Sequence, residues 1–249
     1  MTIYFKQGRS LYMKLNKKIL SLVAISSLGF LSVIPSANAL TSEANVNFTE
    51  PTTLPDIVDP DDPSTPLEPE PAPGGNVNTE PGSLTLDYVS HLEFGSHALS
   101  PRAQTYYAQN EKTPFAQVTD VRGTGAGWRL TASLSNFTDG TDDSLEGATI
   151  TLLNDAGDIV TTPDNFNAAA PTLTNEITLN SSTNDTQLVT NALANTGKGT
   201  WVTRWQDNDT ETDYNQSVAL NVPAAVATEG AHTATITWEL SNAPTGVTP

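Results

Sequence analysis

Residues 128–134 read WRLTASL, and residues 234–240 read ATITWEL. In both stretches an apolar residue stands at every second position, and the residues between them are polar or charged. Successive side chains of a β-strand point to opposite faces, so a period of two places one face on a core and the other in water. This pattern is typical of antiparallel sheets with one buried and one solvated face. Both stretches are therefore predicted to be antiparallel strands.

The same alternation recurs between these two stretches and before them. It is found at residues 84–88, 92–94, 148–152, 177–179 and 218–222. Leu84, Leu86 and Tyr88 are expected to share one face, and residues 184–194 are the best candidate for a short helix. Many short strands with Gly, Pro, Asn and Asp between them predict an all-β fold, either an antiparallel β-sandwich or a partly closed barrel, over residues 83–249.

Residues 40–82 have a different composition. They contain nine prolines and nine acidic residues and no Lys or Arg. Such a stretch buries little apolar surface and repels itself into extended conformations. We expect a disordered Pro/acidic stalk that acts as a spacer before the β domain.

The first 39 residues have the order of a secretory signal peptide. A basic cluster at Lys14, Lys17 and Lys18 precedes a mostly apolar run over residues 19–34, and residues 37–39 form a small-residue triplet, Ala-Asn-Ala. The apolar run is too short for a stable membrane span. We therefore predict cleavage after Ala39, secretion, and no membrane insertion of the mature chain. The pattern leaves open whether Met1 or Met13 is the start.

Charge and cysteine content exclude several classes of function. The chain has a net charge of −17. Cleavage after residue 39 would leave 6 basic against 28 acidic residues, a net charge of −22. Such a protein is repelled by nucleic acids and by anionic membranes and wall polymers, so we expect no nucleic-acid partner and no attachment by simple charge attraction. The absence of cysteine excludes thiol catalysis, disulfides and thiolate metal sites.

Few residues point to catalysis. The three histidines, His91, His97 and His232, match no metal-ligand spacing, and no G-x-S-x-G nucleophile turn is present. The many carboxylates do not single out one pair for glycoside hydrolysis. We expect a non-enzymatic protein without a cofactor or bound metal.

One metal alternative stays open. Residues 207–213 resemble the start of a calcium loop, but Thr212 and Val218 stand where an EF-hand needs Gly and Glu. A looser calcium site would use either Asp207, Asp209, Glu211 and Asp213 or Asp139, Asp142 and Asp143. The other interpretation of these acids is that they are solvated hairpin tips.

The four tryptophans are the candidate binding residues. Trp128 with Leu130, and Trp238 with Leu240, form two Trp-x-Leu triplets whose members share a strand face. Each pair lies in a longer apolar run, so a core position is favoured over a ligand-facing one. Trp201 and Trp205, with Tyr214, have polar neighbours and are predicted to form an exposed stacking platform.

The sequence around the two triplets resembles the WxL domain family of Gram-positive surface proteins. Residues 118–130, VTDVRGTGAGWRL, resemble the first family motif, and residues 232–244, HTATITWELSNAP, resemble the second. Residues 90–95, SHLEFG, match an early Leu-x-Phe-Gly segment. The second motif has Glu239 and Asn242 where the family pattern has Thr and Asp, at positions expected to face water.

The resemblance implies attachment to the cell surface through peptidoglycan, without covalent anchoring. It also implies other cell-surface proteins as partners. The alternative is a structural subunit of a multi-protein surface complex that is held by a membrane-anchored partner protein. In the first motif, Arg122 is expected to pair with Asp120 and lock the turn before Trp128, or else to meet a carboxylate on a partner. The lock is favoured.

Overall fold

The computed structural model describes residues 40–67, 75–109, 112–155, 157–165, 168–207 and 214–242. The predicted signal peptide lies outside these residues. The chain divides into two units, Met1–Asn47 and Phe48–Pro249, and every strand that the structure describes belongs to the second unit. No helix among the described residues is long and apolar enough to cross a membrane.

The regular secondary structure of the second unit consists almost entirely of short strands. In chain order they are β1 (Gly75–Val77), β2 (Leu84–Ser90), β3 (Gln104–Ala108), β4 (Phe115–Asp120), β5 (Trp128–Leu134), β6 (Phe137–Thr138), β7 (Asp143–Ser144), β8 (Thr149–Leu153), β9 (Ile159–Thr161), β10 (Thr172–Leu173), β11 (Glu176–Asn180), β12 (Gln187–Ala192), β13 (Gly199–Arg204), β14 (Asn215–Val222) and β15 (Ile236–Asn242). A single 3₁₀ turn, Pro163–Asn165, is the one helical element among the described residues. The prediction of an all-β fold is confirmed.

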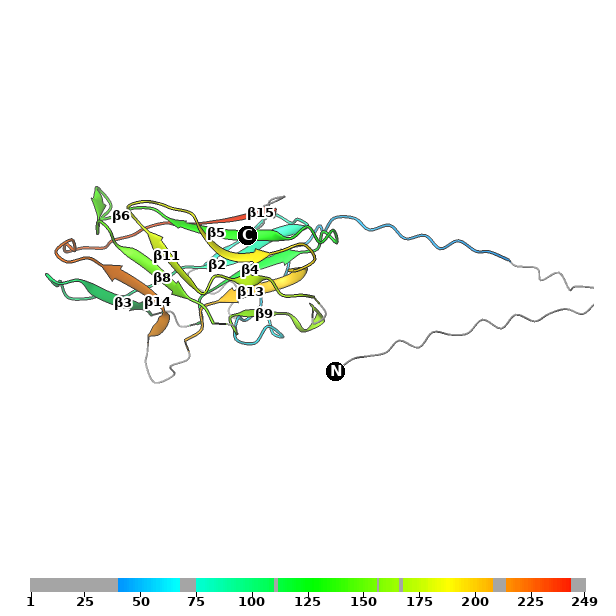
Figure 1. Ribbon diagram of the computed structural model, residues 1–249, viewed down its shortest axis with the longest axis horizontal. Helices are drawn as coiled ribbons and strands as arrows, with labels where there is room; N and C mark the ends of the chain where they lie inside the picture. The colour runs from blue at the N-terminus through cyan, green and yellow to red at the C-terminus, as the bar shows by residue number, and fades with distance from the viewer. Residues whose placement is uncertain are drawn as a thin grey trace, which may run out of the picture. The chain divides into compact units, whose positions relative to one another are not determined.

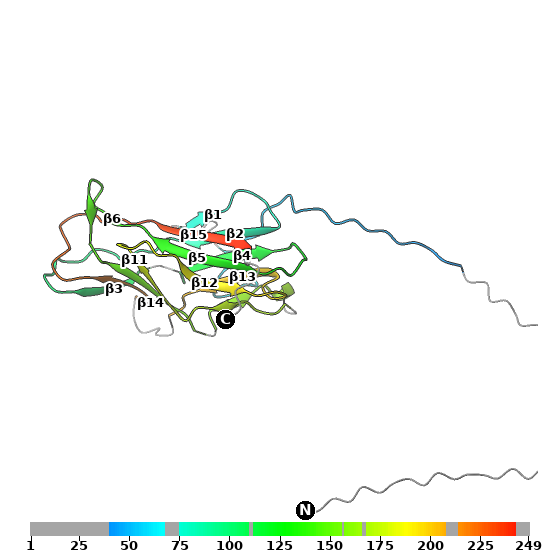
Figure 2. The same cartoon turned by 45° about the horizontal axis from the view of Figure 1, so that its top comes forward.

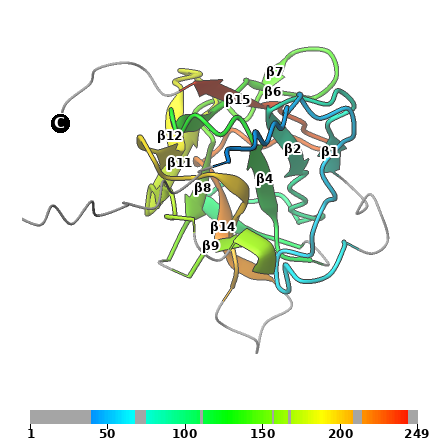
Figure 3. The same ribbon diagram turned by 90° about the vertical axis from the view of Figure 1, so that its right-hand side faces the viewer.

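The strands form three open antiparallel sheets and one small hairpin, β6–β7. The first sheet has the order β1-β2-β4-β13-β9, the second β10-β12-β5-β15, and the third β11-β8-β14-β3. The second sheet lies across the first, while the third extends toward the other end of the unit (Figures 1 and 2). Figure 3 shows the unit end-on, with the strands arranged around its middle, and none of the sheets closes into a barrel.

One main hydrophobic core joins the three sheets. Its buried residues include Val118 and Trp201 from the first sheet, Trp128 from the second, and Ile150 and Leu220 from the third. These side chains are the apolar members of the alternating pattern, and each full burial of such a side chain contributes roughly 1.5–3 kcal/mol. The pattern in the sequence therefore predicted the inward faces of β5, β8, β11 and β14 correctly.

A second, smaller core lies on the outer face of the first sheet. Residues 56–67, which we call the strap, fold back on themselves, since the Leu67 amide donates to the Ile57 carbonyl at 2.9 Å. Ile57, Val58 and Leu67 are buried, and they form one cluster with Tyr88, Phe115 and Val202. The ring centroids of Tyr88 and Phe115 are 4.5 Å apart. The strap thus covers β2, β4 and β13.

The strap differs from the prediction that residues 40–82 are a disordered stalk. Three apolar residues within this Pro/acidic stretch find a hydrophobic surface that the sheet provides, and their burial offsets the cost of ordering the strap. Residues 75–77 also form a strand, β1, which pairs with β2. Residues 68–74 lie outside the described residues.

Polar groups beneath the strap fix its position. The Gln117 side chain accepts a hydrogen bond from the Val58 amide (3.0 Å) and donates to the Asp56 carbonyl (2.9 Å). The side-chain amide of Gln117 also donates to Asp87 (3.0 Å), whose carboxylate is almost fully buried. Thr119 and Thr85 donate to that carboxylate as well, at 2.6 and 2.5 Å. Burial raises the pKa of Asp87, although these hydrogen bonds act in the opposite direction.

Three local expectations were wrong. Residues 92–94, which alternate in sequence, belong to no strand. Residues 184–194 contain β12 rather than a short helix, and a bulge between Leu188 and Thr190 breaks the alternation that would have marked a strand. A second bulge, between Leu86 and Tyr88, turns Tyr88 to the outer face under the strap, while Leu86 packs on the main core. One extra residue in a strand reverses the facing of everything after it.

Candidate functional site

The two Trp-x-Leu triplets lie on neighbouring strands, β5 and β15. In their antiparallel register Leu240 lies opposite Leu130, and Trp238 lies opposite Ala132. β5 is an inner strand of its sheet, and Trp128 (1% exposed) and Leu130 are fully buried there. β15 is an edge strand, and its Trp238 and Leu240 are half-buried. The structure therefore brings the two triplets together, the first within the core and the second at its margin.

The indole of Trp128 is held by the backbone of a nearby turn. Its Nε1 donates to the Gly197 carbonyl at 2.8 Å. Gly197 has a φ of +69°, and a Cβ there would lie 2.7 Å from that nitrogen. Gly127 has a φ of +79°, and a Cβ on it would lie 2.2 Å from the Ala192 carbonyl oxygen. Both positions require glycine, because φ is positive and a side chain would meet the Trp128 indole at Gly197 and the backbone of Ala192 and Leu193 at Gly127.

The predicted exposed platform of Trp201 and Trp205 is wrong. Trp201 is 4% exposed and Trp205 is 1% exposed. Their indole nitrogens donate to the Lys198 carbonyl (2.8 Å) and to Asn154 Oδ1 (3.1 Å). β13, which carries Trp201, lies between β4 and β9 in the first sheet, and Trp205 directly follows it. Of the predicted platform, Tyr214 alone is exposed.

Polar neighbours misled the prediction because they are themselves buried. Thr203 lies beside the tryptophans and is almost inaccessible, with its hydroxyl 2.7 Å from the Thr190 hydroxyl. The ring of Trp205 packs on Trp238, with centroids 5.6 Å apart. The four tryptophans thus belong to the core or its margin.

Arg122 forms the predicted lock and also reaches the second motif. Its guanidinium pairs with Asp120 at 2.8 Å and donates to the Gly127 carbonyl at 2.8 Å. This pairing raises the pKa of Arg122. Its Nη1 also donates to Asn242 Oδ1 at the end of β15. Asn242, which departs from the family pattern, is therefore a partner of Arg122 rather than only a solvated residue.

The third sheet presents an open outer face that carries polar side chains. The inward residues of β8, β11 and β14 are buried, so the alternate residues point outward. These outward residues are Thr149, Thr151 and Leu153 on β8, Glu176, Thr178 and Asn180 on β11, Ala219 and Asn221 on β14, and Thr105 and Tyr107 on β3. We call this set the polar face.

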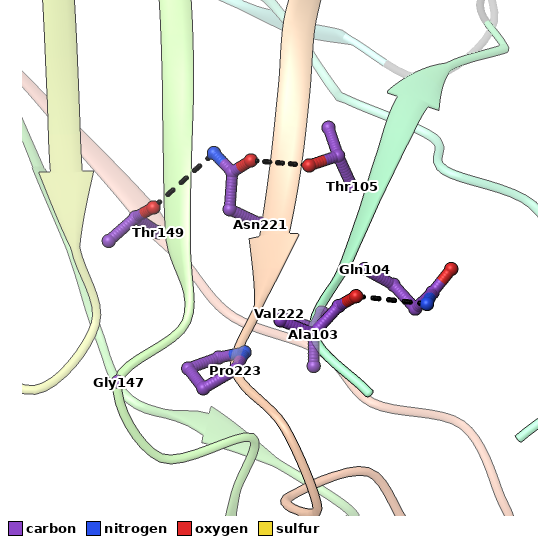
Figure 4. A pocket seen from close by; sticks show the side chains of 8 residues that line it. All are labelled: Ala103, Gln104, Thr105, Gly147, Thr149, Asn221, Val222 and Pro223. Carbon is purple, nitrogen blue, oxygen red and sulfur yellow. Dashed lines mark hydrogen bonds between the residues drawn. The ribbon is translucent and has the colours of Figure 1, made fainter. Parts of the chain in front are cut away.

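A hydrogen-bonded row crosses the polar face. The Asn221 amide accepts from the Thr105 hydroxyl (2.9 Å) and donates to the Thr151 hydroxyl (3.2 Å). Figure 4 shows Thr149, Asn221 and Thr105 side by side on three strands. Because each hydroxyl uses only part of its capacity, Thr151 can still donate to a ligand and Thr105 can still accept.

A shallow hollow of about 280 Å³ lies at the end of this row. Ala103, Gln104 and Thr105 line one side, Asn221, Val222 and Pro223 the middle, and Gly147 and Thr149 the other side (Figure 4). Tyr107, which is exposed, lies in the next row of the sheet, opposite Ala219. An exposed aromatic ring beside amide and hydroxyl groups is suited to a ligand that carries both apolar and polar faces.

The polar face is also almost uncharged. Glu176, on an edge strand, is its one charged residue, in a chain whose net charge is −17. The sequence alone singles out neither these threonines nor Tyr107. The signal that would have identified this face is the run of outward positions without charge on β3, β8 and β14.

The described part of the chain brings no three His, Asp or Glu residues into a metal-binding group. Asp139 accepts the amides of Thr141 and Asp142, at 2.9 and 3.0 Å, so its carboxylate stabilises its own turn. These hydrogen bonds lower its pKa. The alternative calcium site over residues 207–213 lies mostly outside the described residues.

The histidines lie apart from each other in different settings. The imidazole of His97 stacks on Tyr106, with ring centroids 4.1 Å apart. His232 Nδ1 lies 2.9 Å from the Ser144 hydroxyl, and its Nε2 lies 2.9 Å from the Thr228 carbonyl. His91 is exposed.

Comparison with known proteins identified one family. A family model described as "WxL domain surface cell wall-binding" matches residues 35–244. No curated protein and no solved structure gave a match.

Proposed function

Because the chain belongs to the WxL domain family of surface cell wall-binding proteins, we propose that it attaches non-covalently to peptidoglycan through the polar face and has no catalytic role. The observation that carries this proposal is the contrast between the Trp-x-Leu triplets, one fully buried and one half-buried, and the open, nearly uncharged outer face of the third sheet. A wall-binding domain needs an accessible surface, and the tryptophans of its motifs are occupied with packing.

The chemistry of the polar face suits the glycan strands of peptidoglycan. Sugar hydroxyl and N-acetyl groups donate and accept hydrogen bonds, and the hydroxyls of Thr105 and Thr151 retain capacity for both. The apolar face of a sugar ring can pack on Tyr107. An uncharged surface also lowers the repulsion between this acidic protein and an anionic wall.

A binding assay on purified peptidoglycan tests the polar face. Thr105→Asp removes the hydroxyl that donates to Asn221 and adds a negative charge, and we expect at least a tenfold weaker affinity, about 1.4 kcal/mol. Tyr107→Ala removes the ring, and we expect a loss of affinity of about twofold to thirteenfold, from about 0.5–1.5 kcal/mol of aromatic packing.

Thr237→Asp is the matched control, because Thr237 is an exposed strand threonine on the second sheet. All three variants should melt close to the unmodified protein. If Thr105→Asp and Tyr107→Ala bind like Thr237→Asp, the polar face is not the wall-binding surface. If purified peptidoglycan is bound only after other surface proteins are added, the protein is instead a subunit held by a partner.

A further inference from the structure

The edge strand β15 leaves part of the core uncovered. It pairs with β5 on one side, and no described strand pairs with its other side. Its inward residues Ile236, Trp238 and Leu240 are only half-buried, whereas Trp128 and Leu130 on the neighbouring β5 are fully buried. At seven residues, β15 is also the longest edge strand that the structure describes. A strand added beside it would bury these three side chains and pair its free backbone groups.

The N-terminal part of the described chain contains a segment with the pattern of such a strand. Residues 44–49 read ANVNFT, in which apolar and polar residues alternate. In the structure these residues form no strand, and Val46 and Phe48 are 77% and 88% exposed. An alternating segment that pairs with nothing and exposes its apolar side chains is a candidate for pairing with another chain. The family match begins at residue 35 and so includes this segment.

The two patterns fit each other in one antiparallel register. If Phe48 lies opposite Trp238, Val46 lies opposite Leu240, and all four side chains point to the core side of the sheet. Asn47 then lies opposite Glu239, the one charged residue of β15. Residues 44–49 carry no charge themselves, so the segment can approach Glu239 without the like-charge repulsion that most of this acidic chain would meet.

We propose that residues 44–49 of one copy of this chain add as a strand to the β15 edge of a second copy. The contact is heterologous, with the donor segment of one molecule on the acceptor edge of the next, so it either closes as a reciprocal exchange or continues as a linear assembly. This interaction is independent of peptidoglycan and of the polar face.

Disulfide trapping tests the contact, since the chain has no cysteine of its own. Asn47→Cys and Glu239→Cys are made as separate full-length proteins and mixed under mild oxidation. We expect a disulfide-linked dimer that joins positions 47 and 239 as the main product. Mixing Asn47→Cys with Thr105→Cys, an exposed threonine on the edge strand β3, is the matched control and should give little product.

A second measurement avoids the introduced cysteines. Sedimentation of the unmodified protein should show association that increases with concentration, and Val46→Asp with Phe48→Asp should abolish it. Leu99→Asp, which changes another exposed apolar residue, should leave the association intact. Equal trapping at residues 239 and 105, or a protein that stays monomeric at every concentration, would overturn the proposal. The Asn47→Cys/Glu239→Cys double variant places both cysteines in one chain. If it forms an internal disulfide while the mixed single variants form no dimer, the segment pairs within its own chain and the proposal is contradicted.

Discussion

Trp128 and Trp238 occupy equivalent places in the two motifs, but their surroundings differ. Trp128 lies on an inner strand, is fully buried and donates its indole hydrogen to Gly197. Trp238 lies on an edge strand, is half-buried and packs on Trp205. A side chain contributes to stability in proportion to the surface and contacts it removes from solvent. The two motifs are therefore expected to contribute unequally to stability.

Substitution of each tryptophan by alanine measures this difference. Trp128→Ala leaves a large cavity and an unpaired Gly197 carbonyl, and we expect it to lower the free energy of unfolding by about 3–5 kcal/mol. Trp238→Ala should lower it by less, because part of that ring already faces solvent. Urea denaturation of both variants checks the order. A Trp128→Ala protein that unfolds like the unmodified one would make the first triplet a binding surface rather than core.

At the scale of elements, the strap shows how a segment of unfavourable composition becomes ordered. Leu67 and Ile57 fill the small core over Phe115, and the Gln117 amide binds the strap backbone on both sides of Ile57. Arg204 adds a hydrogen bond to the Pro60 carbonyl at 2.7 Å. The strap is therefore stabilised by its contacts with the first sheet, and not by the conformational preferences of its own residues.

Limited proteolysis distinguishes this strap from a disordered stalk. A protease of broad specificity is needed, because residues 40–82 contain no Lys or Arg. The protected fragment should retain residues 56–67. Leu67→Asp places a charge in the small core and should expose the strap to cleavage, whereas Leu54→Asp, at a partly exposed leucine just before it, should not. Mass spectrometry of the fragments shows where cleavage occurs. Trimming of the unmodified protein to near residue 80 would contradict the prediction that the strap is ordered.

The sequence predicted the elements whose two faces differ clearly. β5, β8, β11, β14 and β15 carry apolar residues at alternate positions, and each is a strand where it was expected. The wrong predictions share one physical cause, which is that burial and strand register depend on pairing with segments distant in the chain. β13 and Trp205 are buried by neighbours on both sides, and the bulges before Tyr88 and Thr190 shift the facing of β2 and β12. None of these contacts leaves a local pattern.

The candidate site was harder to predict than the fold. The turn of Asp120 and Arg122 was predicted because both partners lie two residues apart. The row of Thr105, Asn221 and Thr151 comes from three strands that are far apart in sequence. Taken singly, each of its residues resembles an ordinary solvent-facing residue of a strand. An uncharged patch on an acidic protein becomes visible only when the strands are placed side by side.

At the scale of the whole molecule, charge determines how the protein approaches a wall. The chain carries −17, and removal of the predicted signal peptide would change this to −22. Arg122 and Arg204 are engaged within the fold, whereas Arg102 is exposed. Direct attachment to an anionic wall therefore has to overcome net repulsion.

Salt should accordingly not weaken direct binding to peptidoglycan. The screening length falls from about 10 Å at 0.1 M to about 3 Å at 1 M salt, which reduces the repulsion between the protein and anionic polymers. We expect an affinity that is unchanged or stronger at high salt in a pull-down series. A steep loss of binding would contradict contact through the uncharged face and would point to Arg102.

The pairing of β15 with β5 also bears on the order in which the molecule can fold. Thr131 and Glu239, which face each other across this pair, are 108 residues apart in the chain. Contacts between such distant residues form slowly, because a long loop must close before they bring any gain. The strand that supplies half of the Trp205–Trp238 contact, β15, is also the last strand that the structure describes. A growing chain therefore cannot complete its core until residue 242 is available, so the second sheet and the packing of Trp238 on Trp205 form only after the rest of the β domain has been synthesised.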